Sequence, residues 1–453
     1  MTARRPVRRP RRGWRFLPTA AALLALVTAP VASAAITSKA ERHIVTAVDR
    51  HAPAALELLR RTVDVNSGTM NPEGVREVGR MFAAEFDALG FATRWVDGAA
   101  WGRAGHLIAT RTGKGRGPRV LLIGHLDTVF EKDSPFQRYE SVSDSTACGP
   151  GVCDMKGGDV IMLLALRALK EAGALDRLSV TAVLTGDEEK PGAPLDQARG
   201  DLIAAARDAD VAIGFEDGDG DPRHAVIARR GNSGWVLRVS GTPAHSSQIF
   251  RADLGSGAIY EAARILVAFK DSLSIEPYLT VNPGTVVGGT TITFDPEGSR
   301  GTAFGKTNVI AESTLVTGDL RTISLEQREG AKAIMRRIVA ASPPHAGAEI
   351  TFTDGYPPLA PSDGNQRLLA IYDRASRDLG TGPVEAVDPS RAGAADVSFT
   401  EGHVGMAIDG IGMRGDGGHT VGETADLRWL GWQAKRAALM LARLPAAAGG
   451  RRR

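Results

Sequence analysis

Short apolar runs alternate with longer stretches of helical periodicity through the first half of the chain. The runs at 120–124, 180–185 and 211–215 are rich in branched side chains, which predicts strands buried on both faces. Between the first two runs, residues 157–172 repeat apolar positions every three or four residues, and Gly173 then favours a helix end. This alternation predicts an α/β fold with a mixed, mostly parallel sheet flanked by helices.

The pattern changes from about Ser233. Residues 235–240 alternate apolar and polar side chains, as a strand with one buried face does, and helices are expected near 258–270 and 325–341. The α/β pattern resumes near Pro357. A smaller α+β domain inserted into the larger domain explains this interruption.

The N-terminus has the pattern of an export signal. Seven arginines and no acidic residue occur within residues 1–34, and an apolar run at 16–32 leads to the A-x-A pattern Ala32-Ser33-Ala34. We expect a cleaved signal peptide and a periplasmic or secreted protein, exported by the general secretory or the twin-arginine route. The run is shorter than the roughly 20 residues of a spanning helix, so we expect no stable membrane association after cleavage.

Removal of the seven arginines takes the formal net charge from +3 to −4, which gives no reason to expect a nucleic-acid partner. The two cysteines, Cys148 and Cys153, are too few for a disulfide scaffold or a cysteine-rich zinc site. A short-loop disulfide and two free small residues remain alternatives. The expected organisation is a signal peptide at 1–34, a catalytic domain at 35–231 and 354–445, an inserted domain at 232–353 and a disordered tail at 446–453.

Residues that can bind metal follow the predicted strands. His125 and Asp127 come after the first strand, Glu188 and Glu189 after the second, and Glu216 after the third. Because ligand crevices in open parallel sheets lie at the carboxyl ends of the strands, these side chains should meet at one edge.

Two further clusters carry the same kind of side chain. Asp154 lies in a Gly-rich loop before the expected helix, and His419 ends a second Gly-rich stretch after a mostly apolar run at 404–411. Two histidines and three carboxylates suit a pair of zinc ions, and two neighbouring metals need a carboxylate that bridges them. The sequence therefore predicts a two-metal site.

Five motifs, in order along most of the chain, closely resemble the di-zinc metallopeptidase family of glutamate carboxypeptidase, acetylornithine deacetylase, succinyl-diaminopimelate desuccinylase and aminoacylase. They are Gly124–Phe130, Gly149–Gly158, Thr185–Glu189, Gly241–Ser246 and Gly418–Thr420. The exported glutamate carboxypeptidase is the nearest member, through Phe215-Glu216 and Gly318–Arg321. The resemblance implies a zinc exopeptidase-like fold in which the inserted α+β domain serves as a lid and dimerisation domain.

The resemblance also implies the metal ligands. His125 and Glu216 would bind one Zn²⁺, Glu189 and His419 the other, and Asp154 would bridge both. Cobalt and manganese suit the same ligands.

The catalytic roles follow from the same match. Asp127 would accept the second N–H of His125 and fix its tautomer. Glu188 would take a proton from the metal-activated water and return it to the leaving amine. His245, from the inserted domain, would donate to the tetrahedral oxyanion and would reach the site of the neighbouring subunit in a homodimer.

The positions that bind substrate in the family agree less completely with this sequence. Asn308 and Arg321 correspond to positions that hold the substrate carboxylate in the family. Asp354-Gly355-Tyr356-Pro357 stands where the glutamate-specific relative has two arginines, so the charge that would select a glutamate side chain is missing. Arg391 could supply a different cation.

The expected function is that of an exported zinc-dependent carboxypeptidase or amidohydrolase. It would cleave the amide bond of a small peptide or N-acyl amino acid that has a free carboxylate. The alternative is a catalytically silent metal- and peptide-binding relative, which would have no need for Glu188. A calcium loop starting at Asp217 is excluded because Ala228 occupies its twelfth position, and the sequence contains neither Gly-x-Ser-x-Gly nor His-Glu-x-x-His.

Overall fold

The computed structural model describes residues 36, 38–115, 117–296 and 298–446. The expected signal peptide at 1–34 and all but the first residue of the expected tail at 446–453 lie outside these residues. Within the described part of the chain, none of the helices combines the length and the apolar character needed to cross a membrane.

A six-stranded sheet forms the centre of the larger domain, in the order β1-β2-β6-β3-β7-β16. Strands β6, β3, β7 and β16 are parallel, and the antiparallel pair β1 and β2 completes one edge, which confirms the expected mixed, mostly parallel sheet. The strands are β1 (Ala92–Asp97), β2 (Gly105–Arg111), β3 (Arg119–His125), β6 (Ser179–Thr185), β7 (Val211–Gly214) and β16 (Met406–Ile408).

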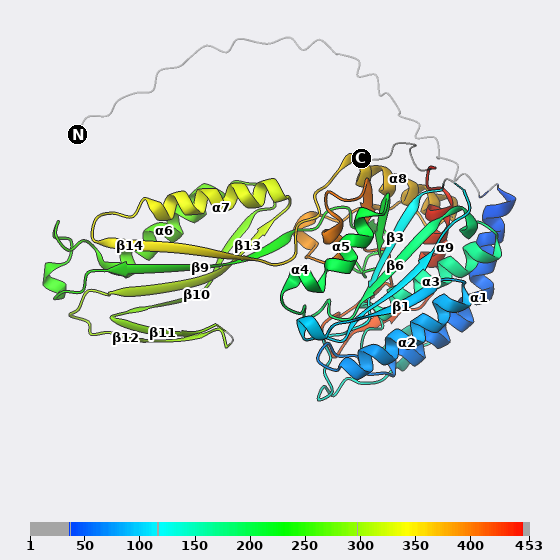
Figure 1. Cartoon of the computed structure of the whole chain (residues 1–453), viewed down its shortest axis with the longest axis horizontal. Helices are drawn as coiled ribbons and strands as arrows, with labels where there is room; N and C mark the ends of the chain where they lie inside the picture. The colour runs from blue at the N-terminus through cyan, green and yellow to red at the C-terminus, as the bar shows by residue number, and fades with distance from the viewer. Residues whose placement is uncertain (1–35, 37, 116, 297, 447–453) are drawn as a thin grey trace, which may run out of the picture. The chain divides into compact units, whose positions relative to one another are not determined.

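Helices cover both faces of this sheet (Figure 1). Successive residues of a strand point to opposite faces, so Leu122 packs in one core with α1, α2, α3, α8 and α9, whereas Leu121 and Ile123 pack in another with α5. The predicted helix at 157–172 is α3, which ends before Gly173 at a φ of 69°. The helices are α1 (Lys39–Val63), α2 (Pro72–Ala88), α3 (Lys156–Glu171), α4 (Leu195–Ala198), α5 (Gly200–Arg207), α8 (Asp363–Asp378) and α9 (Arg428–Ala442).

Short strands shape the loops at the rim of the larger domain. A four-stranded sheet in the order β17-β18-β5-β4 joins residues that are far apart in the sequence, and β8 pairs with β15. These strands are β4 (Glu140–Ser143), β5 (Thr146–Cys148), β8 (His224–Ala225), β15 (Glu385–Ala386), β17 (Gly415–Asp416) and β18 (Thr424–Asp426).

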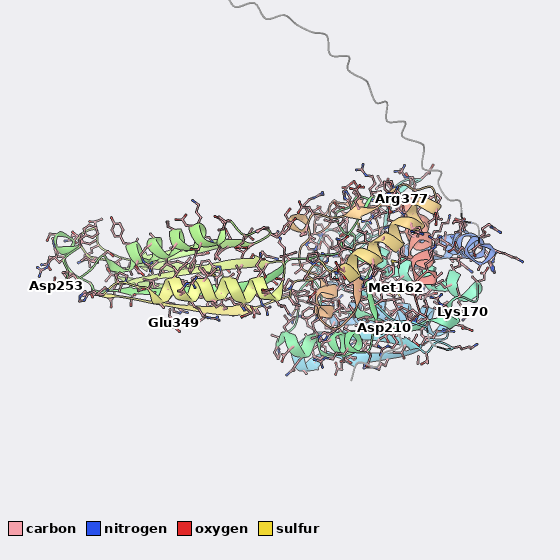
Figure 2. The ribbon with its side chains drawn as sticks, turned by 90° about the horizontal axis from the view of Figure 1, so that it is seen from above. Met162, Lys170, Asp210, Asp253, Glu349 and Arg377 are labelled. Atoms are coloured by element: carbon pink, nitrogen blue, oxygen red, sulfur yellow. The ribbon has the colours of Figure 1, made fainter. Side chains whose placement is uncertain are left out.

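The inserted segment builds its own antiparallel sheet, in the order β10-β13-β9-β14, with α6 and α7 on one face (Figure 1). Its core is separate from that of the larger domain and includes Trp235 and Phe269, whose ring centroids lie 5.9 Å apart. Glu349 of β14 is exposed, whereas Met162 of α3 is buried in the larger domain (Figure 2). The elements are β9 (Gly231–Gly241), α6 (Gly257–Leu273), β10 (Thr280–Gly289), β11 (Thr291–Asp295), β12 (Arg300–Phe304), β13 (Ser313–Thr322), α7 (Leu325–Ala340) and β14 (Ala346–Asp354).

Two glycines let other segments approach the end of β7. A methyl group added to Gly158 of α3 or to Gly412 would lie 1.9 Å from the carbonyl oxygen of Phe215. Phe215 directly precedes Glu216, so this close packing fixes the backbone from which Glu216 projects.

We expect Gly158→Ala to lower the free energy of unfolding by about 1–3 kcal/mol, because the added methyl forces α3 away from β7. Gly200→Ala is the matched control, since no atom lies within 4 Å of the methyl that it would add to α5. Urea denaturation followed by circular dichroism measures both variants. Equal stability of the two would contradict the proposed packing constraint.

Candidate metal centre

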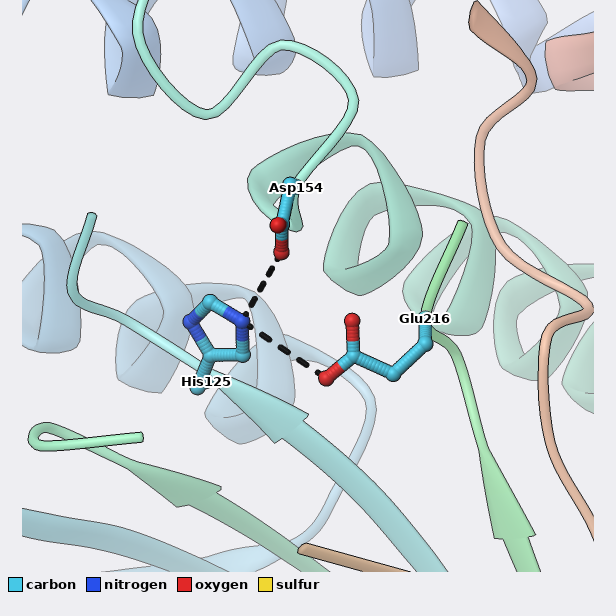
Figure 3. A group of neighbouring side chains, drawn as sticks. All are labelled: His125, Asp154 and Glu216. Atoms are coloured by element: carbon cyan, nitrogen blue, oxygen red, sulfur yellow. Dashed lines mark hydrogen bonds and ion pairs between the residues drawn. The ribbon is translucent and has the colours of Figure 1, made fainter. Parts of the chain in front are cut away.

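Two groups of metal-binding side chains share one carboxylate. His125, Asp154 and Glu216 form the first group, and Asp154, Glu189 and His419 the second, with the ligand atoms of each group within 4.8 Å of one another. Nε2 of His125 lies 3.1 Å from Oδ1 of Asp154 and 3.6 Å from Oε1 of Glu216 (Figure 3). Nε2 of His419 lies 3.1 Å from Oδ2 of Asp154. The two oxygens of Asp154 thus face different histidines, as a bridging ligand requires.

The sheet and its loops bring the five candidate ligands together. His125 ends β3, Glu189 follows β6, and Glu216 follows β7, while Asp154 precedes α3. His419 lies in the loop between β17 and β18, at a φ of 62°. The side chain of His125 is 1% exposed and that of His419 is 60% exposed, so the centre opens toward solvent on the His419 side.

Buried negative charge dominates the centre. Burial raises the pKa of Glu188 and of Glu216 well above the usual range and also raises that of Glu189. Hydrogen bonds to Asp154 and Glu189 raise the pKa of His419 to about 11. Buried carboxylates are costly without compensating cations, so this donor set fits divalent metal ions.

Asp127 has a wider role than the sequence indicates. Nδ1 of His125 lies 3.0 Å from the backbone carbonyl oxygen of Asp127 and 3.5 Å from its carboxylate, so the carbonyl is the nearer partner. The carboxylate accepts the N–H groups of Glu188 at 3.0 Å and Glu189 at 3.2 Å, and the hydroxyl of Thr69 at 2.6 Å. Asp127 therefore holds both His125 and the loop that carries Glu188 and Glu189.

Glu423 supports the loop of the shared ligand, and the sequence analysis missed it. Its carboxylate accepts the backbone N–H groups of Gly151 at 3.1 Å, Cys153 at 2.8 Å and Asp154 at 3.1 Å. The sequence feature that could have indicated Glu423 is its position four residues after His419. Cys153 and Cys148 are both free thiols, so the disulfide alternative is not formed.

His245 and the expected substrate residues belong to neither ligand group. His245 is exposed, and the neighbouring Ser246 donates its N–H to the carbonyl of Asn308 at 2.9 Å, so His245 and Asn308 lie close together in the small domain. Arg321 pairs with Asp319 at 2.6 Å. Arg391, in the larger domain, pairs with Asp219 at 3.2 Å.

Arg321 and the His245 region occupy opposite ends of one strand pair. Arg321 lies opposite Asn232, whereas Ser313, at the other end of β13, lies opposite Ser240, and His245 lies beyond that end. At about 3.3 Å per residue, β13 alone separates Ser313 from Arg321 by roughly 26 Å. One small substrate therefore cannot contact both His245 and Arg321 of the same chain.

Comparison with known proteins identifies relatives of similar sequence and fold. Carboxypeptidase G2 from Pseudomonas sp. (strain RS-16) is 25% identical over 401 residues, which cover 87% of this chain and 90% of that protein. The aminopeptidase PepT from Bacillus cereus has a similar fold, with a TM-score of 0.67 and 20% identity over 86% of this chain and 98% of its own. So does the Bacillus subtilis YXEP protein, described as a dinuclear metal-binding peptidase, with a TM-score of 0.58 and 15% identity over 87% and 98% of the two chains.

The family model for peptidase family M20/M25/M40 matches residues 121–443, which is more than half of the chain and includes all five candidate ligands. With its paired ligand groups and its mixed sheet, this chain belongs to peptidase family M20/M25/M40 and is a metallopeptidase of that family.

Proposed function

We propose that the protein is an exported, zinc-dependent carboxypeptidase or amidohydrolase that cleaves the amide bond of a small peptide or N-acyl amino acid with a free carboxylate. The observation that carries this proposal is a half-buried carboxylate, Glu188, which lies next to the candidate ligand Glu189 and belongs to neither ligand group. Similarity to carboxypeptidase G2 supports the carboxypeptidase assignment, and the N-terminal sequence pattern supports export.

Metal binding and proton transfer are assigned to different residues. His125 and Glu216 would hold one metal, Glu189 and His419 the other, and Asp154 both. Two bound Zn²⁺ ions would lower the pKa of water and polarise the scissile carbonyl, and Co²⁺ or Mn²⁺ would suit the same donors. Glu188 would accept the proton of the attacking water and deliver it to the leaving nitrogen.

The substrate carboxylate would be bound by residues of the small domain. Asn308 and His245 lie at one end of the strand pair and Arg321 at the other, so we assign them to two subunits of a homodimer. Asp354 is acidic and so cannot supply a cation for a glutamate side chain, and its carboxylate accepts hydrogen bonds from Lys332 at 2.7 Å and Ser233 at 2.6 Å. The site should therefore require a free carboxylate without selecting a glutamate side chain.

The substrate class is tested with pairs of N-acyl amino acids that differ only in amidation of the carboxylate. Loss of a charged hydrogen-bond partner should lower kcat/KM of the amidated compounds by roughly 10-fold or more. Hydrolysis is measured for the zinc-loaded protein by release of the free amine. Equal rates for both members of each pair would contradict a carboxylate requirement.

Glu188→Gln keeps the shape of the side chain but removes the base, so hydrolysis should fall by roughly 10² or more. Its metal content should stay unchanged.

Asp154→Ala is the contrasting variant, because removal of the shared ligand should reduce the content of both metals. Elemental analysis beside the kinetic assay separates the two cases. Full activity of Glu188→Gln would support the alternative that the base lies elsewhere, and an inactive wild type with bound metal would support the catalytically silent relative.

Subunit mixing tests whether His245 acts across a dimer. His245→Ala and Glu188→Gln homodimers should each have low activity, and mixing them should restore activity up to about a quarter of wild type, because half the dimers are mixed and each has one complete site. Native mass spectrometry verifies subunit exchange. No recovery after verified exchange would reject the cross-subunit route.

A further inference from the structure

The loop that carries Glu188 and Glu189 is held by a second buried network, centred on Arg199. Arg199 connects α4 to α5 in the sequence, and its side chain is fully buried. Its guanidinium donates to the Asp187 carboxylate at 2.6 Å, to the Asp187 carbonyl oxygen at 3.0 Å and to the Asp396 carboxylate at 2.6 Å. Burial disfavours the charged form, but Asp396 and Asp187 compensate, and the pKa of Arg199 is raised well above its ordinary value overall. The network therefore supplies a fixed anchor directly before Glu188.

Tyr356 connects this anchor to the backbone of Glu188. Its hydroxyl accepts a hydrogen bond from Arg199 at 2.6 Å and donates to the carbonyl oxygen of Glu188 at 3.1 Å. The ring packs edge-on against Phe399, with centroids 4.9 Å apart. Burial, reinforced by Asp396 and Glu188, raises the pKa of the Tyr356 hydroxyl well above its ordinary value, so the phenol keeps the proton that it donates.

Tyr356 also belongs to the connection with the small domain. It comes two residues after Asp354, the last residue of β14. Its N–H donates to the side chain of Asn232 at 2.8 Å, and the N–H of Asn232 donates to the carbonyl of Tyr356 at 3.0 Å. The two connecting segments are thus bound to each other, and Tyr356 extends from them into the core of the larger domain.

We infer that Tyr356 is a positioning residue for Glu188, an inference that rests on the proposed role of Glu188 as the base. Side chains hold both backbone polar groups of Glu188, since Asp127 accepts its N–H at 3.0 Å and Tyr356 donates to its carbonyl at 3.1 Å. Without the hydroxyl, the peptide group between Glu188 and Glu189 is held on one side only. A displaced base loses rate steeply, because proton transfer requires accurate placement of the carboxylate.

Tyr356→Phe removes only the hydroxyl and is the test variant. We expect kcat to fall about tenfold or more, with KM and zinc affinity unchanged. The matched control is Tyr372→Phe in α8, whose buried hydroxyl donates to Gln433 at 3.1 Å. Tyr356→Phe loses two hydrogen bonds, one from Arg199 and one to Glu188, and Tyr372→Phe loses one. The stability of both variants is therefore measured by urea denaturation, and kcat is compared under conditions in which both are folded, where loss of base positioning affects only Tyr356→Phe.

Amide hydrogen exchange of the metal-free proteins gives a readout that is independent of activity. The N–H of Glu189 belongs to the peptide group whose carbonyl Tyr356 binds, so it should exchange faster in Tyr356→Phe than in wild type or in Tyr372→Phe. An unchanged kcat, or a kcat reduced equally in both variants, would overturn the inference. Loss of zinc affinity in Tyr356→Phe would also overturn it, since the role would then concern the ligand Glu189.

Glu188→Gln, measured in parallel, distinguishes failure of the positioning role of Tyr356 from failure of the proposed role of Glu188 as the base. If Glu188→Gln is inactive while Tyr356→Phe matches the control, the positioning role alone is wrong. If Glu188→Gln keeps full activity, the proposed base is wrong, and the positioning role is overturned with it.

Discussion

Compensation of buried carboxylates is the constraint on which the rest of this structure depends. Acidic residues follow the parallel strands, and a carboxylate that is shielded from water needs hydrogen-bond donors or opposite charge. Some of these groups receive their donors from the protein. Asp127 accepts two backbone N–H groups and a hydroxyl, and Glu423 accepts three backbone N–H groups. Others, among them Asp154 and Glu216, have only histidine as a nearby partner in their ligand groups.

This difference separates two roles for one chemical group. A carboxylate whose lone pairs are occupied by backbone donors cannot also approach a cation freely, so Asp127 and Glu423 shape the loops. A carboxylate that faces imidazole and other carboxylates has lone pairs available, so Asp154 suits a metal. Glu188 fits neither set, since its backbone is held by Asp127 and Tyr356 while its half-buried carboxylate belongs to neither ligand group. That combination of a fixed backbone and an unassigned carboxylate is what a proton-transfer group needs.

The sequence predicts those strands and helices whose apolar residues form a clear local pattern. The strands at β3, β6 and β7 and the helix α3 agree with the expected ranges to within one residue, because continuous apolar runs and a terminal glycine specify them locally. His125, Glu189 and Glu216 were predictable as neighbours because parallel strands bring their carboxyl ends together, whereas Asp154 and His419 lie in Gly-rich loops and were marked by their motifs. The supporting residues were not. Tyr356 contacts Arg199 across 157 positions and Glu188 across 168, and Glu423 contacts the loop of Asp154 across 269 to 272. No local sequence pattern marks such distant partners.

The metal ligands and the proposed substrate residues differ in how the fold supports them. Each ligand other than His419 lies within a few residues of a strand or helix of the central sheet layer, and Gly158 and Gly412 pack directly against the backbone next to Glu216. Asn308 and Arg321 instead belong to a separate sheet with its own core. If the small domain binds substrate as proposed, substitutions there would change substrate binding without disturbing the carboxylates of the metal centre. Tyr356 is the exception, because it follows β14 of the small sheet and yet contacts Glu188, so a change in the connection between the sheets would affect both.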